Sequence, residues 1–179
     1  MLSTIHDDHV NMSKLLRLLS KKIQLLEDDQ KIDYRLVKGI ISYLKNYADK
    51  YHHPMEDMIY EYYLKYRVVS DQVANRLSQE HQLIKEATIE VDQLLDMILL
   101  DAVVPREQCI DKLEQFLQLQ TAHMNYEEQE ILPNIKASLT EDDWQILHKR
   151  WQSDGHSDPL FGDNITEQYK GLADRIKAS

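Results

Sequence analysis

Two segments of the chain carry a histidine with an acid four residues further on and a second acid directly after it. They read His52-His53-Pro54-Met55-Glu56-Asp57 and His123-Met124-Asn125-Tyr126-Glu127-Glu128, 71 positions apart because 123 minus 52 is 71. Residues four apart on a helix share a face, with Cβ atoms roughly 5 to 6 Å apart, so an imidazole and a carboxylate can reach the same ion. The spacing therefore predicts two pairs of metal ligands, His52 with Glu56 and His123 with Glu127.

Two further histidines interrupt apolar stripes that repeat along the chain. The first stripe is Ile5, His9, Met12, Leu16, Leu19, Ile23 and Leu26. The second has the same alternation of four and three residues 72 positions later (81 minus 9 is 72): Leu77, His81, Ile84, Thr88, Val91, Leu95 and Ile98. His9 and His81 occupy matching places, each directly after an acid, so the pattern predicts that both imidazoles face the core.

Four inward imidazoles and two inward carboxylates would be costly to bury without a partner. A buried carboxylate that lacks one costs several kcal/mol, and bound cations remove that penalty. Imidazole nitrogen and carboxylate oxygen without thiolate suit iron, manganese or zinc, and two carboxylates that can bridge favour two ions. The predicted ligands are His9, His52, Glu56, His81, His123 and Glu127. A register shifted by one residue, which would use His53 and Asp57, stays open as an alternative.

These ligands need long helices to bring them to one level. The chain has only four Gly and four Pro in 179 residues, and its apolar periodicity and punctuation predict helices over about 3–28, 33–66, 70–100 and 105–138. Short links make such helices antiparallel neighbours, which predicts an all-α, up-down-up-down four-helix bundle over residues 1–138. Pro54 lies inside the second helix and predicts a kink beside His52, with a helix break there as the alternative.

Residues 139–179 leave the repeat and are predicted to form a short helical C-terminal extension. Thr140 and Asp143 have the spacing of a capping box, and a last helix is expected over about 166–176. Two Trp and one Phe in this segment predict that it packs on the bundle, with a homodimer contact as the alternative.

Composition narrows the functional classes. A net charge of −10 argues against a nucleic-acid partner, because phosphate binding needs clustered Lys and Arg. The single cysteine, Cys109, excludes an internal disulfide and favours a cytoplasmic location. The most apolar stretch, residues 94–104, is interrupted by Asp96 and Asp101, so no membrane span or membrane partner is expected.

The segments DDH, YHHPMED, EH and HMNYEEQEILP, in this order, resemble the hemerythrin-like HHE cation-binding family over roughly residues 1–138. This resemblance implies an antiparallel bundle that holds two iron ions with a solvent-derived oxo or hydroxo bridge. By the same resemblance the ligands would be His9, His52, Glu56, His81, His123 and Glu127.

The chain also departs from the oxygen-carrying members of that family. Those proteins place a second histidine one turn from the first on their third helix, where this chain has Leu77 and Lys85. They also use an acid five residues after the last histidine, which makes Glu128 an alternative to Glu127. Four histidines and two carboxylates resemble instead the iron-sensing and iron-sulfur-repair branches.

The expected function is therefore that of a metal-binding protein more than of a dedicated enzyme. We expect a di-iron protein that binds or senses oxygen, nitric oxide or peroxide, or that protects iron centres. The alternatives are an iron donor, metallochaperone or iron sensor, and a metal-free helical interaction module.

Overall fold

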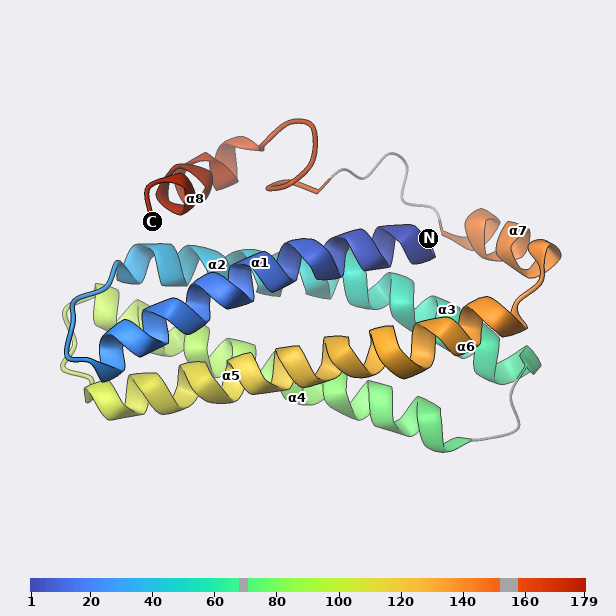
Figure 1. Cartoon of the computed structure of the whole chain (residues 1–179), viewed down its shortest axis with the longest axis horizontal. Coiled ribbons are helices and arrows are strands. Elements are labelled where there is room, and N and C mark those ends of the chain that lie inside the picture. The colour runs from blue at the N-terminus through green and yellow to red at the C-terminus, as the bar shows by residue number, and fades with distance from the viewer. Residues whose placement is uncertain (68–70, 152–157) are drawn as a thin grey trace.

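The computed structural model describes residues 1–67, 71–151 and 158–179, and the regular structure in these ranges is entirely helical (Figure 1). The predicted all-α class is confirmed. The elements in chain order are α1 (Leu2–Glu27), α2 (Tyr34–Tyr47), the π-helical turn η1 (Ala48–His52), α3 (His53–Arg67), α4 (Asp71–Leu99), α5 (Arg106–Tyr126), the π-helical turn η2 (Glu127–Ile131), α6 (Leu132–Ser138), α7 (Glu141–Arg150) and α8 (Glu167–Lys177).

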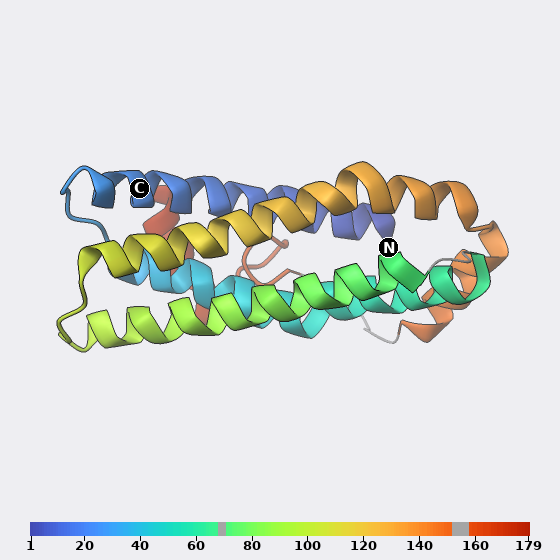
Figure 2. The same ribbon diagram turned by 90° about the horizontal axis from the view of Figure 1, so that it is seen from below.

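These elements form four long rods that lie side by side in both views (Figures 1 and 2). The first rod is α1, the second is α2, η1 and α3, the third is α4, and the fourth is α5, η2 and α6. Successive rods run in opposite directions in Figure 1. The second and fourth rods contain more segments than the single helices predicted for them, and the predicted start of the third helix at Ser70 lies outside the described residues.

The extra segments are the two π turns, and each is closely followed by a proline. The His53 N–H bonds to the Ala48 carbonyl in η1, and the Leu132 N–H bonds to the Glu127 carbonyl in η2. The next residues are Pro54 and Pro133, which have no N–H and would clash with the preceding α-helical turn. The wider turn accommodates the ring, so the second rod stays helical through Pro54, and the alternative of a helix break there is wrong.

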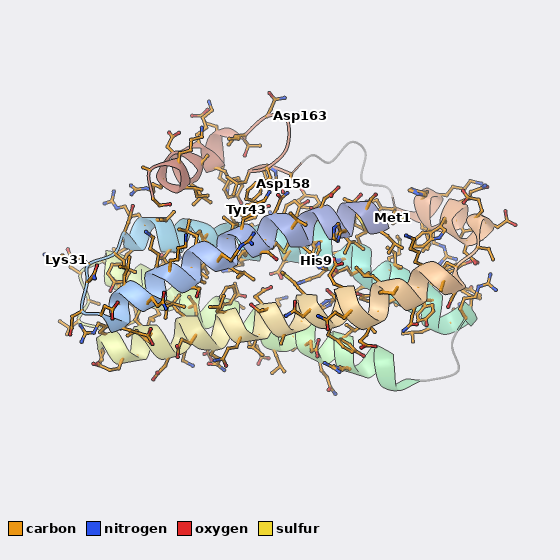
Figure 3. All side chains as sticks on the ribbon, in the orientation of Figure 1. Met1, His9, Lys31, Tyr43, Asp158 and Asp163 are labelled. Atoms are coloured by element: carbon orange, nitrogen blue, oxygen red, sulfur yellow. The ribbon has the colours of Figure 1, made fainter. Side chains whose placement is uncertain are left out.

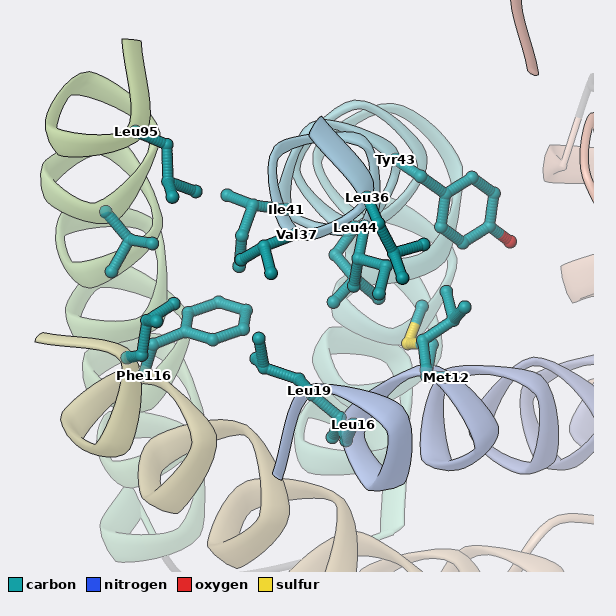
Figure 4. Close-up of a cluster of buried hydrophobic side chains, with 14 of the residues drawn as sticks. Met12, Leu16, Leu19, Leu36, Val37, Ile41, Tyr43, Leu44, Leu95 and Phe116 are labelled. Carbon is teal, nitrogen blue, oxygen red and sulfur yellow. The ribbon is translucent and has the colours of Figure 1, made fainter. Parts of the chain in front are cut away.

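The apolar core is divided along the rods into two clusters. The first cluster joins residues 12–26 of α1, 36–48 of α2 and η1, 91–95 of α4 and 109–124 of α5 (Figure 4). The second joins Ile5 with residues 55–62 of α3, Leu77 of α4, 131–139 of the fourth rod and Leu147 of α7. On every rod, the predicted ligands fall at the boundary between the two clusters. A polar layer is therefore held between two apolar ones.

The C-terminal segment packs on the second rod. Tyr43 of α2 donates a hydrogen bond to Asp158 at 2.8 Å, and its ring meets the Tyr169 ring of α8 edge to face (Figure 3). The predicted capping box of Thr140 and Asp143 starts α7, and Asp143 also accepts a hydrogen bond from Tyr62 of α3 at 2.7 Å. The division into a bundle over 1–138 and an extension over 139–179 stays a prediction, as does a homodimer contact.

None of the described helices has both the length and the apolar character that a membrane crossing requires.

Candidate metal centre

The six predicted ligand residues meet in the polar layer, contributed by all four rods. His9 comes from α1 and His81 from α4, and the two HxxxE pairs come from the second and fourth rods. The side chains of Glu56 and Glu127 are completely shielded from solvent, and His81 is the most accessible of the six, with 11% of its side chain exposed. Figure 3 shows His9 in the space between α1 and the fourth rod.

Glu56 lies between two pairs of imidazoles and turns one oxygen toward each pair. Its Oε1 lies 3.1 Å from His52 Nε2 and 3.3 Å from His9 Nε2. Its Oε2 lies 3.6 Å from His81 Nε2.

Glu127 repeats this division from the fourth rod. Its Oε2 lies 3.3 Å from His9 Nε2. Its Oε1 lies 3.4 Å from His123 Nε2 and 3.9 Å from His81 Nε2. Each carboxylate therefore turns one oxygen toward His9 and the other toward His81.

The Nδ1 atoms of the four imidazoles face away from the centre, and each meets a second carboxylate. The contacts are His52 with Asp8 at 3.1 Å, His81 with Asp57 at 3.0 Å, His123 with Glu80 at 3.0 Å and His9 with Glu128 at 2.8 Å. In each contact the acid lies on one rod and the histidine on the next rod in chain order, and the acid of the fourth rod contacts the histidine of the first. We call the four acids, Asp8, Asp57, Glu80 and Glu128, the acid ring.

The acid ring determines the tautomers of the imidazoles. An ionised carboxylate accepts a hydrogen bond, so each Nδ1 must donate, and the lone pair of a neutral ring is left on Nε2. All four Nε2 atoms point into the centre, and those of His81 and His123 are only 3.1 Å apart. Two lone pairs at that distance repel each other, so a proton or a metal ion must lie between such atoms.

Several buried polar atoms at the centre have no hydrogen-bond partner. Among the described residues, the completely buried side-chain atoms without one are His9 Nε2, both oxygens of Glu56 and Glu127 Oε2. Buried polar groups are almost always paired, and leaving a charged one unpaired is costly. All four atoms belong to predicted ligands and face the same space, so the residues present fit bound cations.

In the absence of metal, the imidazoles of His9, His52 and His81 favour the protonated form. Burial disfavours the charged form of His9, but Glu127 and Glu56 outweigh it and raise its pKa to about 11. Burial likewise disfavours the charged forms of His52 and His81. Glu56 and Asp8 nevertheless raise the pKa of His52 to about 9, and Asp57 and Glu56 raise that of His81 to about 10. Burial also opposes the charge on Glu56, yet the imidazoles around it hold its pKa well below the usual range.

The residues of the alternative predictions have separate places. Asp57 and Glu128 belong to the acid ring, where their oxygens meet Nδ1 atoms of His81 and His9. His53 is buried beside the centre, and its ring stacks on that of His81 with 4.2 Å between centroids. The structure thus brings His53 to the same centre as His52.

Three contributors to the centre were not identified from the sequence. Asp8 and Glu80 were noted only as acids that precede His9 and His81, whereas they support histidines of the neighbouring rods. Tyr60 donates a hydrogen bond to Glu127 Oε1 at 2.7 Å. Its signal was present, since His52, Glu56 and Tyr60 are spaced four apart and share one helix face.

A small cavity lies directly outside the centre, between the second and third rods. Its volume is about 260 Å³, and its walls include His53, His81, Asp57 and Lys85. The cavity therefore borders the side of the centre that holds His81.

Comparison with known proteins gives one match. The family model described as hemerythrin HHE cation binding domain matches residues 1–135. Neither the curated proteins nor the solved structures that were compared with the chain include a significant match.

Proposed function

Because the chain belongs to the hemerythrin HHE cation-binding domain family, we propose that it is a non-haem di-iron protein that binds or senses a small reactive species. Oxygen, nitric oxide and peroxide are the candidate species, and protection of iron centres is the role that such binding would serve. In this proposal the four rods form the antiparallel four-helix bundle that was predicted from the sequence, and the protein is cytoplasmic.

The observation that supports a dinuclear centre best is the way in which the two carboxylates divide their oxygens. Glu56 turns one oxygen toward His9 and His52 and the other toward His81. Glu127 turns one oxygen toward His9 and the other toward His81 and His123. One ion would take His9 and His52, and a second would take His81 and His123, with both carboxylates shared. A single ion would leave one pair of buried Nε2 atoms and two carboxylate oxygens without a partner.

The donor set suits iron, and the likeness to the hemerythrin family is the reason for proposing iron among the metals that it suits. Imidazole and carboxylate without thiolate suit iron, manganese and zinc, and the buried Cys109 belongs to the apolar core away from the centre. Two iron ions, when bound, supply a reversible change of oxidation state and a position at which a small ligand can bind.

The chain's own residues supply orientation, charge and access. The acid ring holds each imidazole with Nε2 inward and increases its basicity. Tyr60 orients Glu127 by donating a hydrogen bond to it. The cavity beside His81 is large enough for a diatomic molecule or peroxide, while the apolar clusters above and below the layer limit other routes.

The direct test is elemental analysis of the protein purified from its own host, combined with optical spectra in air and after reduction. We expect two iron ions per chain and an absorption in air that is lost on reduction. Glu127→Ala should lose metal and lower the melting temperature, because it removes a shared ligand. His148→Ala, at an exposed position on α7, should change neither, and equal effects of the two substitutions would contradict the proposal.

The two alternatives give different results in the same experiment. An iron donor or metallochaperone would release its metal to a mild chelator within the time of mixing, whereas a resident di-iron centre would not. A metal-free interaction module would contain no stoichiometric metal at all.

A further inference from the structure

Two adjacent histidines, His52 and His53, reach the polar layer from the same turn of the second rod. The sequence offers them as alternatives, because consecutive residues of an α-helix point about 100° apart. His52 ends the π turn η1 and His53 comes directly after it. A π turn spreads each turn over more residues and so reduces the angle between neighbouring side chains. Both side chains are buried, with 2% and 8% of the residue exposed.

We propose that His52 and His53 are both metal ligands and that they serve different ions. The inference rests on the proposed dinuclear centre and deepens it. His52 would join His9 at one ion, and His53 would join His81 and His123 at the other, which makes the two positions chemically unequal.

The arrangement of ligand atoms carries this assignment. One ligand atom each from His53, Glu56, His81 and His123 lies within 4.8 Å of the other three, and the same holds for His9, His52 and Glu56 as a separate group. Ligand nitrogens and oxygens stand about 2.1 Å from a bound ion, so opposite ligands of one ion are about 4.2 Å apart. The first group needs only small side-chain adjustments to close on an ion.

The contacts of His53 differ from those of the other four imidazoles. Each of the four donates from Nδ1 to an acid of the ring at 3.1 Å or less. The closest carboxylate to His53 is that of Asp49, at 4.0 Å from its Nδ1. Among the described residues, the His53 ring makes no hydrogen bond, and its neighbours are other imidazoles, stacked on His81 and edge-on to His123. A buried imidazole in that setting needs a partner, and a shared ion provides one.

His53 also lies where the cavity meets the centre. The cavity of about 260 Å³ is lined by both His53 and His81. The ion with three imidazoles would therefore be the one closest to the cavity, and His53 would determine how many positions on it remain free for a small ligand.

The test is a titration of the metal-free protein with cobalt(II), followed by its visible absorption and by competition with a chelator. The wild-type protein should bind two cobalt ions. His53→Gln, which keeps a neutral side chain of similar volume, should weaken one of the two binding steps at least about tenfold and change the absorption of that ion only. His148→Gln should leave both steps and the spectrum unchanged.

Addition of imidazole to His53→Ala separates a ligand from a packing residue. Because the cavity opens on this position, free imidazole should enter and restore the weakened step and its spectrum. The inference is overturned if both binding steps are unchanged in both variants, or if the loss in His53→Ala persists with imidazole although the metal-free variant melts like wild type. In either case two tight ions in the wild-type protein would leave the dinuclear proposal standing, whereas failure of the wild-type protein to bind cobalt would overturn both.

Discussion

At the scale of single residues, the acid ring converts four ordinary histidines into a preorganised set of donors. Each ring acid lies beside a ligand in the sequence but contacts a histidine of another rod, as Glu80 does with His123 and Asp57 with His81. Such outer contacts orient a metal ligand and raise its basicity. Their negative charge also adds to that of Glu56 and Glu127, so the centre favours highly charged cations.

Removal of the charge from one ring acid should weaken metal binding without destroying the fold. For Glu80→Gln and Asp57→Asn we expect metal affinity to fall about 10- to 100-fold, because the histidine loses its fixed orientation. Chelator competition measures the change. Glu86→Gln is the matched control for Glu80→Gln, since Glu86 is an exposed acid of the same helix that accepts a hydrogen bond from Gln82. An affinity in Glu80→Gln that equals the control would show that the ring has no role in binding.

Metal binding at neutral pH should release protons from the centre. The pKa values of His9, His52 and His81 without metal are about 11, 9 and 10, so these imidazoles are protonated at neutral pH and must lose their protons to bind an ion. Calorimetric titration in buffers of different ionisation heat measures the release. Binding without net proton release would contradict the assignment of these residues as ligands.

The same pKa values determine how stability depends on pH. A histidine whose pKa is raised in the folded state stabilises that state below its unfolded pKa of about 6.5, and this contribution is lost as pH rises through the folded value. The melting temperature of the metal-free protein should therefore fall as pH rises from about 6.5 to about 11, while metal affinity rises with pH. Thermal melts of the metal-free protein across this pH range test the prediction. A melting temperature that rises with pH over the range would contradict it.

At the scale of secondary structure, the π turns η1 and η2 adjust the second and fourth rods so that a proline fits without a break. The turn η1 ends at His52 and η2 begins at Glu127. Both lie at the polar layer, where they also rotate the ligand-bearing stretch relative to the rest of the rod. The position of the ligands therefore depends on one extra residue in each rod.

Deletion of one exposed residue from η1 should disturb the centre. Without Lys50, which is exposed, the turn would close as an α-helical turn and rotate His52 and His53 against the anchored residues of α2. We expect the loss of at least one of the two ions while the far-ultraviolet circular dichroism stays helical. Deletion of Gln30, in the exposed link between α1 and α2, is the control. Two tightly bound ions in the protein without Lys50 would show that the π turn does not position the ligands.

Much of this arrangement follows from the sequence, and the remainder depends on contacts between rods. The stripes around His9 and His81 predicted inward imidazoles, because the apolar period of a helix is local. The local sequence could not predict whether His52 or His53 faces the centre, since their directions depend on how the helix accommodates η1 and Pro54. Likewise, Asp8 and Glu80 were visible beside their histidines, but the rotation of each rod against its neighbour decides which imidazole they meet.

At the scale of the whole molecule, the C-terminal segment packs against the second rod and stabilises it. Leu172 of α8 packs on Gly39 of α2 so closely that a Cβ atom at Gly39 would lie 2.9 Å from Leu172 Cδ1. Tyr43, one turn further along α2, meets Asp158 and Tyr169. The match to the family model ends at residue 135, so this support comes from residues beyond the matched region.

Weakening this support should lower stability and leave the metal centre intact. Leu172→Ala removes a buried side chain and should cost about 2 to 5 kcal/mol of unfolding free energy. We expect the variant still to bind two ions, because Leu172 belongs to the first apolar cluster and not to the polar layer. Leu83→Ala, half-exposed on α4, should cost much less. Loss of metal from folded Leu172→Ala would mean that the extension is part of the centre, and denaturant unfolding with metal analysis separates the two results.

The most direct measurement of the central claim is an anomalous difference map at the iron edge from crystals of the protein loaded with iron. We predict two peaks between Glu56 and Glu127, one beside His9 and His52 and the other beside His81 and His123. A single peak, or peaks away from these side chains, would contradict the claim that the polar layer holds a pair of metal ions.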